Sequence, residues 1–461
     1  MAKPVLISLS VCLLVFFHGS FARLQNECQL DRLDALEPDN RIQCDAGMVE
    51  VWNPNHGQFQ CAGVAMVRHT IEPRGLVLPS YSNAPQLTYI VKGRGMIGTL
   101  FPGCAETFQE SQESGRTQDQ HQKIHHFREG DVIALAAGVA HWCYNDGNEP
   151  VITVTVIDTT NIANQLDMNP RNFHLAGNPE NEFQKFQQAG ERGRREYSHQ
   201  GGKGQQGSCR NLFCGIDTRL ISESFNIDEQ LATKLQGQND FRGSIVKVEG
   251  GLRVVRPPRT EQERLEEEEQ GQGGSYNGLE ETFCTMRIKE NIADPSRADV
   301  YVPEVGRVST VNSNNLRILR LLQLSASHVS LSNGAIRLPH WHVNAHSIIY
   351  ALRGQAKIQV VDENGNRVFD GNVKEGQVLT VPQNFVVVKR AESDRFECVA
   401  FNTNDNAVAS DLAGRTSAIR AMPLEVLANA FQVSVEDARR IKSGKQETIL
   451  TRSQSGRRSA T

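Results

Sequence analysis

The feature that most constrains the fold of this 461-residue chain is an internal repeat. Three short anchors occur twice in the same order: a Leu-Pro pair with a Tyr and a Gly following it, a basic-Glu-Gly turn, and Leu-Ala-Gly. The anchors begin at Leu78, Arg128 and Leu175 in the first copy. They begin at Leu338, Lys374 and Leu412 in the second copy. A period of about 240–260 residues indicates a duplicated domain and not a solenoid.

Short apolar runs between the anchors indicate β-strands. They are rich in Val, Ile, Leu and Thr and are bounded by Gly, Pro and Asn, which is typical of an antiparallel sandwich or barrel. The expected strands are Gly75–Leu78, Leu87–Lys92, Asp131–Leu135, Val151–Ile157, Ile348–Leu352, Ala356–Val361, Gln377–Val381 and Phe385–Val388. A helical pattern follows in each copy, at Thr218–Leu235 and Pro423–Ile441. We therefore expect a mainly β fold in which a barrel followed by a small helical segment occurs twice.

The second helical pattern carries an apolar stripe. Its members are Leu424, Leu427, Phe431 and Val435. An amphipathic helix buries such a stripe, so we expect this helix to dock on a neighbouring protomer as well as on its own barrel.

The first 22 residues have the pattern of a secretory signal peptide. Lys3 is followed by an apolar run from Val5 to Phe17 and by Ser20-Phe21-Ala22, a small-x-small exit that predicts cleavage after Ala22. The run is too short for a membrane span, so we expect a lumenal protein without a membrane partner. The net charge of −4 likewise predicts no affinity for nucleic acid.

The cysteines fit an oxidising compartment. Ten are present and Cys12 would leave with the signal peptide, so an odd number remains and at least one is free or intermolecular. Cys209 and Cys214 are close enough for a local loop disulfide, which the spacing neither requires nor excludes. Apolar neighbours predict that the remaining candidates are buried hydrophobic residues and not reactive thiols; these are Cys44, Cys143 and Cys398.

Three polar stretches interrupt the apolar pattern. They are Glu106–Gln122, residues 181–208 and residues 259–277, and they are rich in Gln, Gly, Glu, Ser and Arg. Such compositions bury too little apolar surface to offset the entropy of ordering. We predict disordered, protease-accessible loops.

Both copies resemble cupins, a family of β-barrels with two short motifs. In the first copy the second motif is matched by Gly130, Ala136, Gly138, His141 and Asn145, with Ala where the family has Pro. In the second copy the first motif is matched by Gly334, His340, His342 and Gly354, and Gly376 and Pro382 begin the second. The resemblance implies jelly-roll barrels whose inward histidines and glutamate hold a divalent metal in the enzymes of the family.

One branch of the cupins matches more closely. The segment from Asn277-Gly278 to Thr282 resembles the processing site of 11S globulins, the legumin-type seed storage proteins, and Phe101-Pro102-Gly103-Cys104 and Cys284 match as well. The resemblance covers nearly the whole mature chain and is closest to tree-nut 11S globulins. It implies a disulfide between Cys104 and Cys284 and another between Cys28 and Cys61.

The same resemblance implies how the protein is made, processed and assembled. The chain would be a nutrient reservoir without cofactor or catalysis, which forms trimers in the endoplasmic reticulum. An Asn-specific protease would cut it between Asn277 and Gly278 in the storage vacuole of the seed, and two trimers would then stack into a hexamer. The expected parts are the signal peptide (1–22), an acidic chain with the first cupin (23–258), an acidic loop (259–277) and a basic chain with the second cupin (278–461).

The charge distribution supports the cut without reference to any family. Residues 278–461 contain 23 Lys and Arg against 19 Asp and Glu, a net charge of +4. Residues 23–277 contain 25 against 34, a net charge of −9. A single cut would therefore produce one acidic and one basic chain.

The rival class is a metal-dependent bicupin enzyme, which needs three or four inward ligands. The first copy has Ser80-Tyr81-Ser82-Asn83 where the paired histidines should be, with the register open by one residue, which leaves His141 isolated. The second copy has His340 and His342, with His346 nearby, as weak metal candidates. Ser347 replaces the glutamate and Val387 replaces the last histidine. We therefore predict that these histidines pack and hydrogen-bond, and that a vicilin-like ligand-binding module is disfavoured because vicilins lack the Asn277 site and its cysteine pair.

Overall fold

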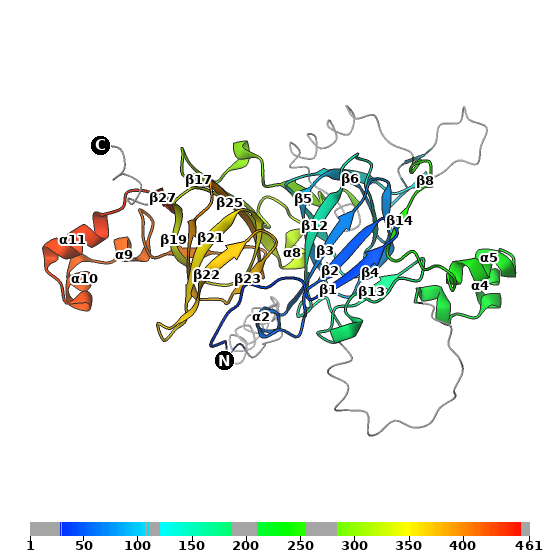
Figure 1. The fold of residues 1–461 in the computed structure, drawn as a ribbon, viewed down its shortest axis with the longest axis horizontal. Helices are drawn as coiled ribbons and strands as arrows, with labels where there is room; N and C mark the ends of the chain where they lie inside the picture. Colours follow the sequence, from blue (N-terminus) through cyan, green and yellow to red (C-terminus); the bar gives the residue numbers. More distant parts are fainter. Residues whose placement is uncertain are drawn as a thin grey trace, which may run out of the picture.

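Two β-barrels lie side by side in the computed structural model of the chain (Figure 1). The structure describes residue 28 and residues 30–106, 108–109, 120–186, 210–254 and 284–452. The predicted signal peptide lies outside these ranges. The prediction of a mainly β fold with two barrels is confirmed.

The N-terminal barrel consists of two sheets. One has the strand order β1-β2-β3-β12-β5-β10-β15, and the other has the order β13-β4-β11-β6-β9, with β14 also paired to β4. The strands are β1 (Asn40–Cys44), β2 (Gly47–Val51), β3 (Val64–Ile71), β4 (Gly75–Ser82), β5 (Gln86–Lys92), β6 (Arg94–Leu100), β9 (Ile124–Arg128), β10 (Asp131–Leu135), β11 (Ala140–Tyr144), β12 (Val151–Asp158), β13 (Asn172–His174), β14 (Ile245–Lys247) and β15 (Lys289–Asn291).

The C-terminal barrel repeats this plan. Its sheets have the orders β16-β17-β18-β25-β20-β23 and β22-β21-β24-β19-β26, with β27 also paired to β19. The strands are β16 (Val300–Val302), β17 (Gly306–Val311), β18 (Ser325–Ser332), β19 (Ala335–His342), β20 (Ser347–Arg353), β21 (Gln355–Val361), β22 (Arg367–Lys374), β23 (Val378–Val381), β24 (Val386–Ala391), β25 (Arg395–Asn402), β26 (Ala409–Asp411) and β27 (Leu450–Arg452). Short α2 (Gly57–Ala62) and α8 (Leu319–Leu322) flank the junction of the barrels.

Alternation of side chains explains why these runs become strands with one buried face. Along β21 the residues Ala356, Ile358 and Val360 are fully buried while their neighbours are partly exposed. By contrast, β10 is buried on both faces, because one face covers its own barrel and the other meets the second barrel. At this junction the ring of Tyr89 stacks on His328, with 6.3 Å between ring centroids.

The register of the strands shows which residues are equivalent in the two copies. On β11, His141 lies opposite Ser80 of β4, and on β24, Val387 lies opposite His340 of β19. Ser80 therefore occupies the position of His340, and Val387 that of His141. The sequence left this register open by one residue, and the strand pairing determines it.

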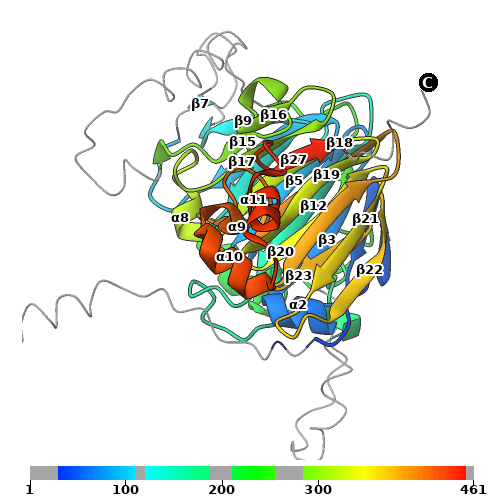
Figure 2. The same cartoon turned by 90° about the vertical axis from the view of Figure 1, so that its left-hand side faces the viewer.

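Both predicted helical segments are present, but the single helix expected over Pro423–Ile441 is divided. Each is a pair of helices and not one: α4 (Thr218–Phe225) with α5 (Glu229–Gln236), and α10 (Leu424–Phe431) with α11 (Val435–Ser443). The left-handed backbone at Asn226 and Gln432, with φ of 54° and 53°, ends the first helix of each pair. Ser434 then caps α11 by accepting a hydrogen bond from the backbone N–H of Asp437. The two helical pairs lie at opposite ends of the molecule, with α9 (Ala418–Ala421) beside the second (Figures 1 and 2).

Two of the stretches predicted to be disordered contain ordered parts. Within Glu106–Gln122, β7 (Phe108–Gln109) pairs with β8 (Gln120–His121). At the start of the second stretch Phe183 is 1% exposed in the core, because its ring completes the apolar packing of the N-terminal barrel. Residues 107, 110–119 and 187–208 of these stretches, and residues 259–277, lie outside the described ranges. Among the described helices, none is both long and apolar enough to cross a membrane.

Candidate functional site

The interior of the C-terminal barrel holds the paired histidines predicted from the motif. His340 and His342 are two residues apart on β19 and their rings are 5.8 Å apart, edge to face. The Nδ1 of His340 donates a hydrogen bond to the backbone oxygen of Leu338, at 2.9 Å. This bond fixes the ring in place, and the side chain is 3% exposed.

Two buried cations surround these histidines. Arg337 and Lys389 are 6% and 3% exposed, and Arg337 forms an ion pair with Asp411 at 2.7 Å. Burial lowers the pKa of His342 to about 4, and the charges of Lys389 and Arg337 act in the same direction. Burial, followed by the charges of Arg337, Lys389 and His342, lowers the pKa of His340 well below its ordinary value.

This electrostatic environment is a poor fit for a divalent metal. A metal ion would have to approach two fixed positive charges. The hydroxyl of Ser347 and the isopropyl group of Val387 stand at the positions where the enzymes of the motif have a carboxylate and an imidazole. Among the residues that the structure describes, no group of three or more His, Cys, Asp or Glu is arranged to hold a metal ion.

The third weak candidate, His346, is held at the barrel rim. Its Nδ1 accepts a hydrogen bond from the backbone N–H of Gln383 at 3.2 Å, and its own backbone N–H donates to the hydroxyl of Thr403 at 2.9 Å. The structure therefore brings His340 and His342 together, whereas His346 takes part in the backbone structure of the rim.

The N-terminal barrel presents a different polar cluster at the equivalent position. His141 and His174 lie on either side of Ser80, on β11 and β13. Burial lowers the pKa of His141 to about 4, and its Nδ1 donates to the oxygen of Val139 at 3.4 Å. Within the part of the chain that the structure describes, neither ring nitrogen of His174 has a hydrogen-bond partner.

Sequence reasoning missed the acidic member of this cluster. Glu182 is 3% exposed, with His69 Nε2 at 3.7 Å from Oε1 and Asn172 Nδ2 at 3.4 Å from Oε2. Burial alone would raise the pKa of Glu182, but the hydrogen bond and charge of His69, the charge of His174 and the hydrogen bond of Asn172 lower it. His141 is therefore less isolated than its sequence neighbours indicated. Only the repeat anchor just after His174 gave a signal that this segment returns to the barrel.

The disulfides join the pairs that the resemblance implied. Cys104 is bonded to Cys284, and Cys28 is bonded to Cys61 in α2. The turn that carries Cys104 is braced by Gln122, whose Nε2 donates to the backbone oxygens of Phe101 and Cys104, both at 3.0 Å. The predicted cleavage residues Asn277 and Gly278 lie outside the described residues.

The other cysteines fall into two groups. Cys44, Cys143 and Cys398 are free thiols; Cys44 and Cys398 are buried, and burial raises the pKa of Cys143 to about 12. Such thiols are poor nucleophiles near neutral pH. Cys214 is disulfide-bonded, and Cys209 lies outside the described residues.

Both helical pairs carry large apolar side chains that are exposed to solvent and not packed against a barrel. Leu220 and Phe225 on α4 are 57% and 55% exposed, and Phe431 on α10 is 52% exposed. Leu427 of the predicted stripe is fully buried, so α10 uses one face for its own subdomain. Large exposed apolar groups at both ends of a molecule indicate protein–protein contacts.

Known proteins resemble the chain along nearly its whole length. A family model described as Cupin matches residues 33–181 and 290–439. The 11S globulin seed storage protein Ana o 2.0101 of Anacardium occidentale is 57% identical over 466 residues, covering 97% of this chain and 98% of the relative. The coconut allergen cocosin, whose crystal structure is known, is 43% identical in sequence. Its structure matches with a TM-score of 0.80 over 93% of this chain and 100% of the cocosin chain. The recombinant pro-11S globulin of pumpkin is 44% identical, with a TM-score of 0.79 over 92% of this chain and 99% of that one.

Proposed function

The chain belongs to the 11S globulins, the seed storage branch of the cupins, and we propose that it is made as one precursor that is cut between Asn277 and Gly278. Its relatives are named as seed storage proteins, so its role is that of a nutrient reservoir and not of an enzyme. Gln-, Asn- and Arg-rich loops carry nitrogen at little structural cost, while the packed barrels resist early proteolysis.

The observation that carries the proposed cut is the disulfide between Cys104 and Cys284. A cut between Asn277 and Gly278 falls between these two cysteines in the chain, so the bond would hold the two products together. The products would differ in charge, at −9 and +4. On a denaturing gel, mature protein should run as one band without reductant and split into an acidic and a basic chain with it. A single full-length band after reduction would contradict the cut.

We also propose that the protein assembles into trimers through its helical ends. Because α4 and α5 lie at one end of the molecule and α10 and α11 at the other, contacts between unlike ends can close into a ring. Phe431→Asp should therefore yield monomers in gel filtration, because it places a charge in the apolar contact. Tyr301→Asp is the matched control, since Tyr301 is 65% exposed on β16, outside both helical pairs. Intact Phe431→Asp trimers would exclude this interface.

The acidic loop gives the cut a role in assembly. Residues 259–277 include four consecutive glutamates, Glu266–Glu269. In the precursor this loop would keep a second trimer away, and the cut would free it to move aside so that hexamers form. Asn277→Gln precursors should remain trimers after protease treatment, whereas wild type becomes hexameric. Equal hexamer formation by both proteins would refute this role.

The signal-peptide pattern of residues 1–22 and the two disulfides support a secretory route to a storage vacuole. Immunolabelling of maturing seeds should locate the cut form in storage vacuoles and the precursor in the endoplasmic reticulum. Cut protein in the cytosol would contradict the proposal.

A further inference from the structure

Each barrel receives an arm from the opposite half of the chain. Residues 30–36, which precede the first barrel, lie against the C-terminal barrel, and residues 287–297, which precede the second, lie against the N-terminal barrel. The proposed cut would place the first arm on the acidic chain and the second on the basic chain. Each chain would then hold part of the other.

The first arm is hydrogen-bonded to two strands of the C-terminal barrel, β22 and β23. The N–H of Leu33 donates to the oxygen of Val368 at 2.8 Å, and Leu36 and Val378 exchange both backbone hydrogen bonds, at 2.7 and 2.9 Å. The side chain of Leu33 is 2% exposed and belongs to the core of that barrel. The N-terminal end of the arm is fixed to the N-terminal barrel by the Cys28–Cys61 disulfide, and its other end continues into β1.

The second arm is the last strand of the larger N-terminal sheet. β15 pairs with β10 in antiparallel register, and the ladder is extended by Ala134 N–H to the oxygen of Ile288 at 2.8 Å and by Ile292 N–H to the oxygen of Gly130 at 3.0 Å. Ile288 and Ile292 are 1% and 2% exposed in the core. Strand addition of this kind is a strong mode of peptide binding, because backbone bonds and alternate side chains act together.

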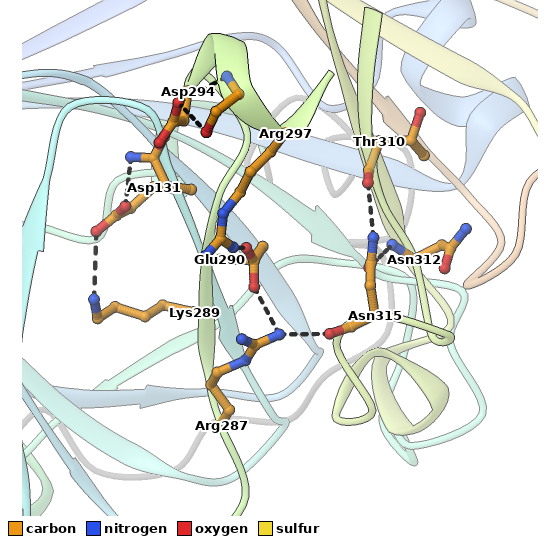
Figure 3. A network of polar contacts seen from close by, with 11 residues as sticks. Asp131, Arg287, Lys289, Glu290, Asp294, Arg297, Thr310, Asn312 and Asn315 are labelled. Carbon is orange, nitrogen blue, oxygen red and sulfur yellow. Dashed lines mark hydrogen bonds and ion pairs between the residues drawn. The ribbon is translucent and has the colours of Figure 1, made fainter. Parts of the chain in front are cut away.

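A polar network fixes the register of the second arm (Figure 3). The carboxylate of Glu290, 8% exposed, lies between the guanidinium groups of Arg287, at 2.6 Å, and Arg297. Arg287 also donates to the backbone oxygen of Asn315 at 2.5 Å, in the second barrel.

A second set of contacts joins the arm directly to β10. The amide of Asn291 donates to Asp131 Oδ1 at 2.7 Å, and Lys289 lies 3.8 Å from the other oxygen of Asp131 (Figure 3). Sliding β15 by one residue would break these contacts and turn Ile288 and Ile292 away from the core.

The two arms are equivalent in the duplicated fold. Val132 pairs with Tyr89 and Val378 pairs with Tyr350, so β10 and β23 are corresponding strands. Glu290 lies opposite Val132, and Leu36 lies opposite Val378. The exchange of arms is therefore reciprocal, and neither chain can leave without stripping an edge from both barrels.

We propose that these reciprocal arms interlock the acidic and basic chains, so that the pair persists after the cut even when the Cys104–Cys284 bond is absent. The inference rests on the proposed cut between Asn277 and Gly278. It assigns the disulfide a secondary role: reduction alone does not separate the chains, and a protease must first remove an arm.

The test uses the full chain carrying Cys104→Ser and Cys284→Ser, purified and then treated with an Asn-specific endopeptidase. Gel filtration in native buffer should give one peak that contains both chains in equal amounts on a denaturing gel. Separate elution of the two chains would overturn the interlock. A single uncut chain on the denaturing gel would instead overturn the proposed cut, and with it the inference.

Variants of the arms distinguish interlocking from general adhesion of the barrels. In the background that carries Cys104→Ser and Cys284→Ser, Leu33→Asp or Ile292→Asp should weaken association of the cut chains by at least about tenfold, since each buries a charge where an apolar side chain packs. Tyr301→Asp should leave association unchanged, because the side chain is exposed. Circular dichroism of each uncut variant reports whether the barrels have folded. Folded arm variants whose cut chains stay as tightly associated as the control would refute the role of the arms.

Discussion

Replacing Lys389 by Met should stabilise the C-terminal barrel. Lys389 lies on β24 with its side chain 3% exposed, and burial lowers its pKa below the ordinary 10.5. The nearby carboxylate of Asp411 is already paired with Arg337 at 2.7 Å. The ammonium group is therefore desolvated next to a second cation, which opposes folding.

The expected gain in the free energy of unfolding follows from the desolvation of the Lys389 ammonium group. Burying an ammonium group costs several kcal/mol, part of which local polarity recovers, and Met has a similar length without charge. We expect the free energy of unfolding to rise by about 1–3 kcal/mol. The sign depends on pH in a defined way. Because the native pKa is depressed, the unfavourable term is fully present below that pKa and disappears as pH rises towards 10.5.

Urea unfolding of wild type, Lys389→Met and Lys374→Met measures this effect. Lys374 is exposed on β22, so its replacement should change the free energy by no more than about 0.5 kcal/mol. NMR titration provides a second readout, since loss of the Lys389 charge should raise the pKa of His342 from about 4. A less stable Lys389→Met protein, or an unchanged His342 titration, would refute the reasoning.

Two further predictions concern the same interior. Asp411→Asn should lower the free energy of unfolding by about 3–5 kcal/mol, because it leaves the buried Arg337 without its partner; an effect below about 1 kcal/mol in urea unfolding would contradict this. Acidification should also destabilise the protein. Burial lowers the pKa values of His141 and His342 to about 4, so the unfolded chain binds more protons as pH falls from about 6.5 to 4, and each histidine should cost about 3 kcal/mol at pH 4. His342→Gln should remove its share of the slope, and an unchanged pH dependence would exclude the mechanism.

The duplicated architecture could be predicted because its signals are local and occur twice. Gly130 and Gly376 adopt φ of 87° and 82° in corresponding turns, a backbone that strongly favours glycine, so both positions remain visible as anchors. Strand positions followed from short runs rich in Val, Ile, Leu and Thr that are bounded by Gly, Pro and Asn. The motif also located His340 and His342 correctly on one face of a strand.

What the sequence could not reveal depends on contacts between distant segments. Glu182 and His69 lie 113 positions apart in the sequence, and Glu182 stands in a polar stretch whose composition indicated disorder. The position of Arg337 and Lys389 beside the histidines could not be predicted either, since the motif specifies the metal ligands and not the charged residues around them. The split of each helical segment depended on left-handed positions such as Gln432, which the apolar stripe does not report.

The apolar cluster that spans the junction of the two barrels has a consequence for how the protein is digested. Arg68 of the first barrel donates to the Tyr350 hydroxyl of the second at 3.0 Å and lies over the ring of Trp52, within a cluster that draws on both halves. Neither barrel can unfold without exposing this shared junction, so the two should unfold as one cooperative unit. In a germinating seed, proteases would then cut the loops gradually, whereas the two barrels of a protomer would be digested together once they unfold. Nitrogen would be released from each protomer in an all-or-none manner.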